Sequence, residues 1–158
     1  MKVKICNHII DIDKEFLTLI KSNHWSVRTN TCGQIYFDAR INGEPNTLHR
    51  IISQCPSGMV VDHINGDTLD NKMSNLRICT KLQNQYNQKK HKGKRHSKYK
   101  GVTFRKELKS KPWEAFIYKD YKSKRLGYFA TEKEAALAYN EAAKESYGEF
   151  AKLNELEG

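Results

Sequence analysis

The chain has 158 residues, of which 28 are Lys or Arg and 18 are Asp or Glu, so its formal net charge is +10. Its four cysteines are widely spaced with no C-x-x-C pair, and no apolar run approaches the length of a membrane span. This pattern argues against a zinc knuckle, secretion and membrane insertion. We therefore expect a cytoplasmic protein with reduced thiols that is not secreted.

The positive charge is concentrated between Lys81 and Arg125, where sixteen basic and three acidic residues give +13, while the remaining residues sum to −3. A local cationic surface attracts polyanions, and each basic side chain placed against a phosphate releases condensed counterions. Nucleic acid is the expected partner. A Lys-rich surface kept for solubility would share this composition. Anionic membrane is a weaker rival, because no amphipathic helix accompanies the charge.

Residues 1–47 are predicted to form a β-rich lead-in. Asn42-Gly43 lies between apolar runs and predicts a hairpin, because both residues tolerate positive φ. The apolar spacing of residues 13–21 predicts one short helix. The predicted strands cover residues 2–10, 25–29 and 34–41.

Residues 48–88 are predicted to form a second segment built as strand, polar loop and helix. The strand is expected at residues 59–61, the turn at Asn65-Gly66-Asp67, and the helix from Asn75 to about Asn87. An apolar stretch around His49 precedes the strand.

The letters VVDHINGDTLDNKMSNLRICTKLQN, from Val60 to Asn84, carry the chemistry. They place Asp62 and His63 at the end of a strand, before a loop rich in Asn and Asp. Phosphodiester hydrolysis needs a water nucleophile, a group that takes its proton, and a Lewis acid. An Asp-His pair before Asn-Gly-Asp is also compatible with an ordinary turn, so the pair alone does not decide.

This stretch resembles the motif of the HNH nucleases of phages and other mobile elements, which folds as a ββα unit around one divalent metal ion. The resemblance implies that His63 is the general base and that Asp62 and Asn84 bind the metal. Asn75 would hold the loop and orient His63. Oxygen ligands favour Mg²⁺ or Mn²⁺ over Zn²⁺. We expect structural support from Asn71 and from His49.

Residues 89–96 are predicted to be an exposed basic linker, since they contain no apolar residue. Residues 97–158 then favour a three-stranded antiparallel meander packed on one helix. Thr131 and Glu134 form a capping-box sequence, and Gly148 marks the helix end. The predicted strands cover residues 101–105, 113–119 and 125–129. The whole chain is thus expected to be of the α+β class.

The letters YKGVTFR, WEAFIY and KRLGYFATEKEAALAYNEAAKESYGEFAKLN, between Lys98 and Asn154, are similar to the Apetala-two (ethylene response factor) DNA-binding domain. That family lays its sheet into the major groove of duplex DNA. Phe116 and Tyr118 depart from its pattern, in which charged residues are common there. By strand alternation, the expected DNA-facing residues are Lys100, Thr103, Arg105, Phe116, Tyr118, Ser123 and Arg125. Arg105 is the expected base-edge contact, and Lys100, Lys106, Lys122 and Lys124 are expected at phosphates. The basic linker, with Lys89, Lys90 and Arg95, is expected in the minor groove or along the DNA backbone.

Together these patterns indicate a site-directed DNA endonuclease of the HNH homing type, acting as a monomer or weak dimer in the cytoplasm of a bacterial or phage-infected cell. No protein partner is evident. One alternative is a DNA-binding transcriptional regulator that does not cut, and another is a nuclease directed at RNA. Duplex DNA is favoured because its wide major groove admits a strand face.

Overall fold

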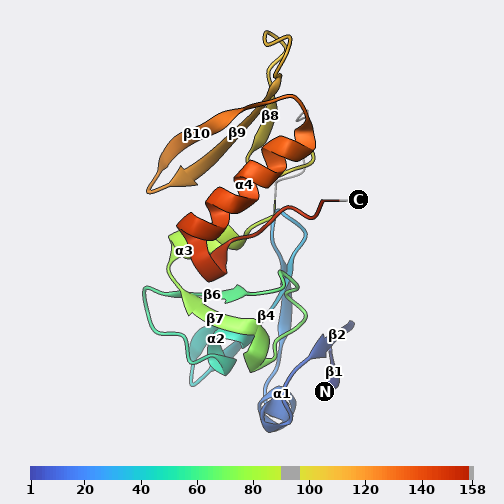
Figure 1. The fold of residues 1–158 in the computed structure, drawn as a ribbon. Helices are drawn as coiled ribbons and strands as arrows, with labels where there is room; N and C mark the ends of the chain where they lie inside the picture. Colours follow the sequence, from blue (N-terminus) through green and yellow to red (C-terminus); the bar gives the residue numbers. More distant parts are fainter. Residues whose placement is uncertain (90–96, 157–158) are drawn as a thin grey trace. The chain divides into compact units, whose positions relative to one another are not determined.

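The computed structural model describes residues 1–89 and 97–156. The chain divides into two compact units, Met1–Gln85 and Tyr86–Gly158. Within the described residues, the paired strands form four small antiparallel sheets accompanied by few helices (Figure 1). The predicted α+β class is confirmed.

The first unit contains three of these sheets. Strands β1 and β2 form a hairpin, β3, β4 and β5 form a three-stranded sheet in that order, and β6 pairs with β7. The elements are β1 (Lys2–Ile5), β2 (His8–Asp11), η1 (Lys14–Phe16), α1 (Leu17–Lys21), β3 (Ser26–Thr29), β4 (Ile35–Ile41), β5 (Glu44–Thr47), α2 (Leu48–Ile52), β6 (Val60–His63), η2 (Met73–Asn75) and β7 (Leu76–Cys79). The next helix, α3 (Lys81–Asn87), begins in this unit and ends in the second.

The hairpin predicted at Asn42-Gly43 is confirmed. Both residues have positive φ, 53° and 83°, and they join β4 to β5. This backbone geometry matches the right-handed twist of the paired strands, which explains why Asn-Gly occupies the turn.

The helix predicted from Asn75 to about Asn87 is wrong in its first half. Leu76–Cys79 is strand β7, which pairs antiparallel with β6, and α3 begins only at Lys81. Leu76 and Cys79 are buried. The backbone bonds that a helix would form locally are made to β6 instead, and burial of these side chains accompanies that pairing.

One hydrophobic core serves both the lead-in and the motif. Ile10, Ile12, Phe37 and Ile52, each no more than 1% exposed, pack in one cluster with Leu76 of β7. Residues 1–47 therefore belong to the same folded unit as the motif.

The N-terminal segment also pairs, through main-chain groups, with the segment that joins β6 to β7 (residues 64–75, called the motif loop). The amide of Asp11 donates to the Leu69 carbonyl at 2.9 Å, and the amide of Asn71 donates to the Asp11 carbonyl at 2.7 Å. The amide of Met73 donates to a carboxylate oxygen of Asp13 at 2.8 Å. These bonds fix the loop on both sides of Asn71.

The second unit contains a sheet in the order β10-β9-β8. Helix α4 packs against this sheet (Figure 1). Thr131 and Glu134 form the predicted capping box at the start of the helix. The elements are β8 (Val102–Phe104), β9 (Trp113–Lys119), β10 (Lys122–Phe129), α4 (Glu132–Tyr147) and η3 (Gly148–Phe150).

Alanines allow close packing between α4 and the sheet. Ala115 of β9 and Ala135 of α4 are fully buried in one cluster, and Ile117 packs with Tyr139 and Ala143 in the next. The inward side chains of β9 are thus odd-numbered, which leaves its even-numbered side chains on the other face.

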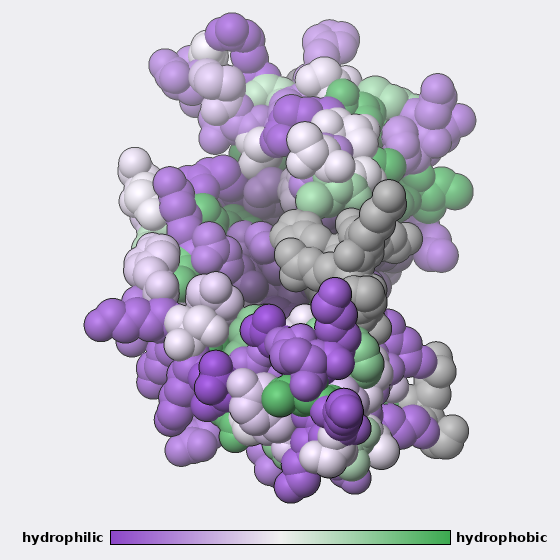
Figure 2. Space-filling view, turned by 90° about the horizontal axis from the view of Figure 1, so that it is seen from above, coloured by the Kyte–Doolittle hydropathy of each residue, from purple (hydrophilic) through white to green (hydrophobic). Residues whose placement is uncertain are grey.

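Hydrophilic side chains dominate the molecular face drawn in Figure 2, and hydrophobic ones form small separate patches there. Within the part of the chain that the structure describes, no helix has the length and apolar character needed to cross a membrane.

Candidate active site and nucleic-acid face

Asp62 and His63 end strand β6, and both side chains are buried, with exposed fractions of 5% and 6%. Strand β7 lies beside them, with Arg77 opposite Asp62 and Leu76 opposite His63. A loop of polar residues joins the two strands. The pair therefore occupies a fixed position at the edge of the core.

The hydrogen bonds of Asn71 orient the His63 ring. Asn71 is 1% exposed, and its Nδ2 donates to the Thr68 carbonyl at 3.0 Å. Because a carbonyl only accepts, this bond fixes the amide so that Oδ1 faces His63, whose Nε2 lies 3.4 Å away. The contact requires a proton on Nε2. In the neutral ring, Nδ1 then carries the lone pair that can accept a proton.

The His49 ring packs beside His63, and the Tyr36 ring packs beside His49. The His49 ring centroid lies 5.5 Å from that of His63 and 5.5 Å from that of Tyr36. Burial lowers the pKa of His49 to about 3, helped by the neighbouring His63. Burial also lowers the pKa of His63, against the effect of its bond to Asn71. His49 thus supports His63 by packing. The contact of Tyr36 with His49 was not predicted from the sequence.

Arg77 binds the Asp62 carboxylate. Its Nε and Nη2 lie 2.9 Å and 2.7 Å from the same oxygen, Oδ2, and the two side chains are 12% and 6% exposed. This partner was not predicted. A signal did exist, because opposite charges that face each other across paired strands attract, but it required knowing that Arg77 lies on a strand.

Asn75 joins the two ends of the motif loop. Its Oδ1 accepts from the amide of Asn65 at 3.0 Å, and its Nδ2 donates to the Asp70 carbonyl at 2.8 Å. The amide of Ile64 also donates to the Asn75 carbonyl at 2.9 Å. These side-chain to main-chain bonds hold the residues that follow His63.

Replacing Asn75 with Ala should lower the free energy of unfolding of the first unit by about 1–3 kcal/mol, because two main-chain groups lose their partners. Urea unfolding followed by Trp25 fluorescence in a Trp113→Phe background measures this change, because Trp25 is then the only tryptophan. Asn7→Ala, at an exposed position, is the control and should have little effect. Equal stability of the two variants would contradict a loop-holding role for Asn75.

Asn84 lies on α3, and its side chain is partly exposed. Asp62 and Asn84 offer a carboxylate and an amide oxygen, which suit a hydrated hard cation better than zinc. No cluster of three His, Cys, Asp or Glu side chains able to hold a metal occurs among residues 1–89 and 97–156.

The outer face of the second unit contains most of the predicted DNA contacts. Thr103 lies opposite Glu114, Ser123 opposite Tyr118, and Arg125 opposite Phe116. Residues opposite each other on paired strands share a face, so these side chains lie on the face away from α4. Arg105 follows β8 directly and joins this face through an ion pair with Glu114. Sequence reasoning missed Glu114.

Lys100 lies apart from this face. It precedes β8, and its Nζ donates to the carbonyls of Tyr86 at 2.6 Å and Gln88 at 2.7 Å. Burial, with the nearby charge of Lys152, lowers the pKa of Lys100 to about 8. Lys100 was predicted to share a strand face with the other DNA-facing residues. In the structure, its side chain instead contacts main-chain carbonyls.

The predicted linker contacts are only partly covered. Lys89 is exposed, whereas Lys90 and Arg95 lie outside the described residues.

Residues 53–86 match the family model of the HNH endonucleases. The match includes Asp62, His63, Asn75 and Asn84, so the chain contains an HNH endonuclease domain, and the predicted resemblance is confirmed at that level. The resemblance of residues 97–158 to the Apetala-two domain stays a prediction.

The chain is also 34% identical over 116 residues to an uncharacterized HNH endonuclease of Acanthamoeba polyphaga mimivirus. The alignment covers 70% of this chain and 58% of that relative. The chain therefore spans little more than half the length of the viral protein. No solved structure matches it.

Proposed function

We propose that this protein is a DNA endonuclease of the HNH homing type, which hydrolyses phosphodiester bonds at sites selected by its second unit. The observation that carries the proposal is the buried His63, oriented by Asn71 inside the segment that matches the HNH endonucleases. A neutral imidazole with a fixed lone pair is the group that general-base catalysis requires.

In this mechanism, His63 takes a proton from the attacking water through Nδ1, the ring nitrogen that carries the lone pair in this tautomer. Asn71 keeps the ring in the required tautomer, and Asn75 holds the loop beside it. Asp62 and Asn84 would hold one Mg²⁺ or Mn²⁺ ion. When bound, that ion supplies Lewis-acid stabilisation of charge on the leaving oxygen.

The second unit would select the site by placing the outer face of β8, β9 and β10 in the major groove, as its resemblance to the Apetala-two domain implies. Exposed aromatic and basic side chains on that face are suited to base edges and phosphates. The division of labour assigns cutting to the first unit and positioning to the second.

Cleavage of duplex DNA from the protein's own genomic neighbourhood, with Mg²⁺, Mn²⁺ or EDTA, tests this proposal. We expect cutting with either ion, products with 5′-phosphate and 3′-hydroxyl ends, and no cutting in EDTA, because chelation removes the ion that would stabilise charge on the leaving oxygen. Binding without cleavage under every divalent ion would favour the regulator. Cleavage of duplex RNA in preference to DNA would favour the RNA-directed enzyme.

A further inference from the structure

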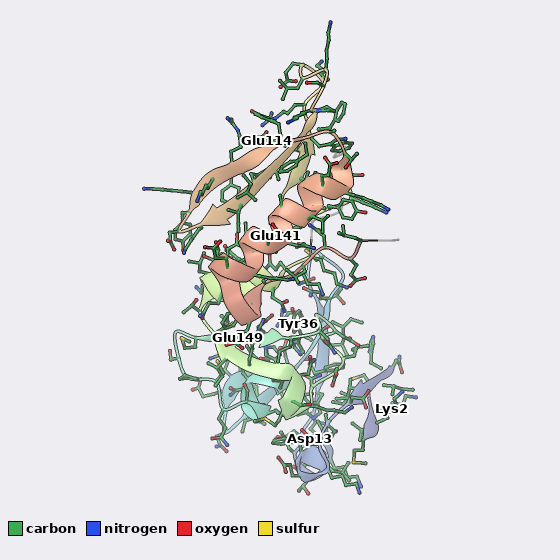
Figure 3. All side chains as sticks on the ribbon, in the orientation of Figure 1. Lys2, Asp13, Tyr36, Glu114, Glu141 and Glu149 are labelled. Carbon is green, nitrogen blue, oxygen red and sulfur yellow. The ribbon has the colours of Figure 1, made fainter. Side chains whose placement is uncertain are left out.

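Glu114 is a buried carboxylate that binds two arginines on the outer face of the second unit. Its side chain is 6% exposed, whereas Arg105 and Arg125 are 46% and 60% exposed. Oε2 accepts from Nε of Arg105 at 2.5 Å, and Oε1 accepts from Nε of Arg125 at 2.8 Å. Glu114 projects from β9, the central strand of the sheet (Figure 3).

The carboxylate is ionised within this cluster. Burial alone would raise the pKa of Glu114, but the hydrogen bonds from Arg125 and Arg105 outweigh it, so the pKa lies below its usual range. Two cations and one anion leave a single positive charge at the surface.

Each arginine uses Nε for the internal bond, which leaves its Nη edge for another partner. In residues 1–89 and 97–156, no protein acceptor binds the Nη groups of Arg105 or Arg125. The guanidinium of Arg125 also lies over the Tyr128 ring, 5.1 Å from its centroid. Both guanidinium groups are therefore held in place through Nε, and their Nη donors can bind another partner.

We propose that Glu114 is a positioning residue that presets Arg105 and Arg125 as readers of two guanines in the major groove of duplex DNA. This inference rests on the proposed DNA-binding function of the second unit. Two parallel N–H donors of a guanidinium match O6 and N7 of guanine, which is the commonest specific contact of arginine with a base.

Guanine is favoured over phosphate because Glu114 holds each guanidinium through its Nε. Phosphate contacts require only mobile cations, and the exposed Lys106, Lys122 and Lys124 supply them. Holding a guanidinium at a fixed angle through Nε reduces the entropy lost when a planar base edge is bound. Glu114 thus gives orientation at the expense of net charge.

Selection from a library of random DNA duplexes by the full-length protein in EDTA tests the proposal, since cleavage is then prevented. We expect two enriched guanines, and replacing either with 7-deazaguanine, which lacks N7, should lower affinity about 10-fold. Glu114→Gln should lose most of the guanine preference at both positions, even though the substitution makes the net charge of the protein more positive. Arg125→Lys, which keeps the charge and loses the fork, should lose one of them.

Asp38→Asn is the matched control, because it removes the carboxylate of an Arg–Asp ion pair in the other unit. In that pair, Arg28 Nε lies 2.8 Å from Asp38 Oδ2. It should leave the enriched sequence unchanged. Guanine preference that survives Glu114→Gln, or a loss of affinity equal for all sequences, would overturn the role of Glu114 while leaving DNA binding intact. A wild-type protein that selects no duplex would overturn both this role and the proposed function.

Discussion

Replacing His63 with Ala should slow metal-dependent DNA cleavage by about 10²–10⁴-fold, the usual contribution of a general base, and leave DNA affinity nearly unchanged. The ring is 6% exposed and contacts Asn71 and His49. No other imidazole lies at the end of β6 in the segment that matches the HNH endonucleases, residues 53–86. Single-turnover cleavage with Mg²⁺ measures the rate, and a binding titration in EDTA measures affinity.

His24→Ala is the matched control for this experiment, because His24 is exposed and lies outside the motif. It should cut as the wild type does. Loss of the His63 ring also leaves Asn71 Oδ1 without this partner, which costs about 1–3 kcal/mol, so thermal unfolding must show that His63→Ala is folded at the assay temperature. A folded His63→Ala that cuts at the wild-type rate would show that the base is another group.

Local sequence signals predicted the turns and the helix cap. Asn42-Gly43 forms its hairpin, and Thr131 with Glu134 forms its capping box. Such features depend on a few neighbouring residues and on backbone preferences that act within them. They could be recognised without knowledge of the fold.

Pairing between distant segments could not be predicted in the same way. Leu76–Cys79 is too short for periodicity to separate strand from helix, and its partner β6 decides the outcome. The bond from Arg77 to Asp62 follows only from that pairing. The contact of Asp11 with the loop at Asn71 joins segments sixty residues apart.

In the candidate site too, local features could be predicted from the sequence, whereas contacts between distant residues could not. The motif indicated Asp62 and His63, because their chemistry is local to the sequence. It did not indicate that Asn71 bonds His63, since that contact depends on how the loop folds back. Alternation along β9 predicted the outer face correctly for Phe116, but the burial of Glu114 between two arginines required the three-dimensional arrangement.

Replacing Gly101 with Ala should destabilise the second unit by about 2–5 kcal/mol. Gly101 has φ of +71°, a conformation that costs an alanine about 1–2 kcal/mol. Its added Cβ would overlap the Tyr139 ring and lie 2.6 Å from the Phe116 carbonyl oxygen. Tyr139 is 2% exposed in the core, so the ring cannot move without disturbing its packing, which adds about 1–3 kcal/mol.

Urea unfolding of the full chain, followed by Trp113 fluorescence in a Trp25→Phe background, reports on this unit, because Trp113 is then the only tryptophan. Gly148→Ala is the control, since Gly148 has φ of +55° with no atom within 4 Å of the added Cβ and belongs to the same unit. It should show the backbone cost alone. If Gly101→Ala is no more destabilising than Gly148→Ala, the close approach of α4 to the sheet at Tyr139 is wrong. If it is much more so, DNA affinity should fall while cleavage by the first unit persists without selectivity.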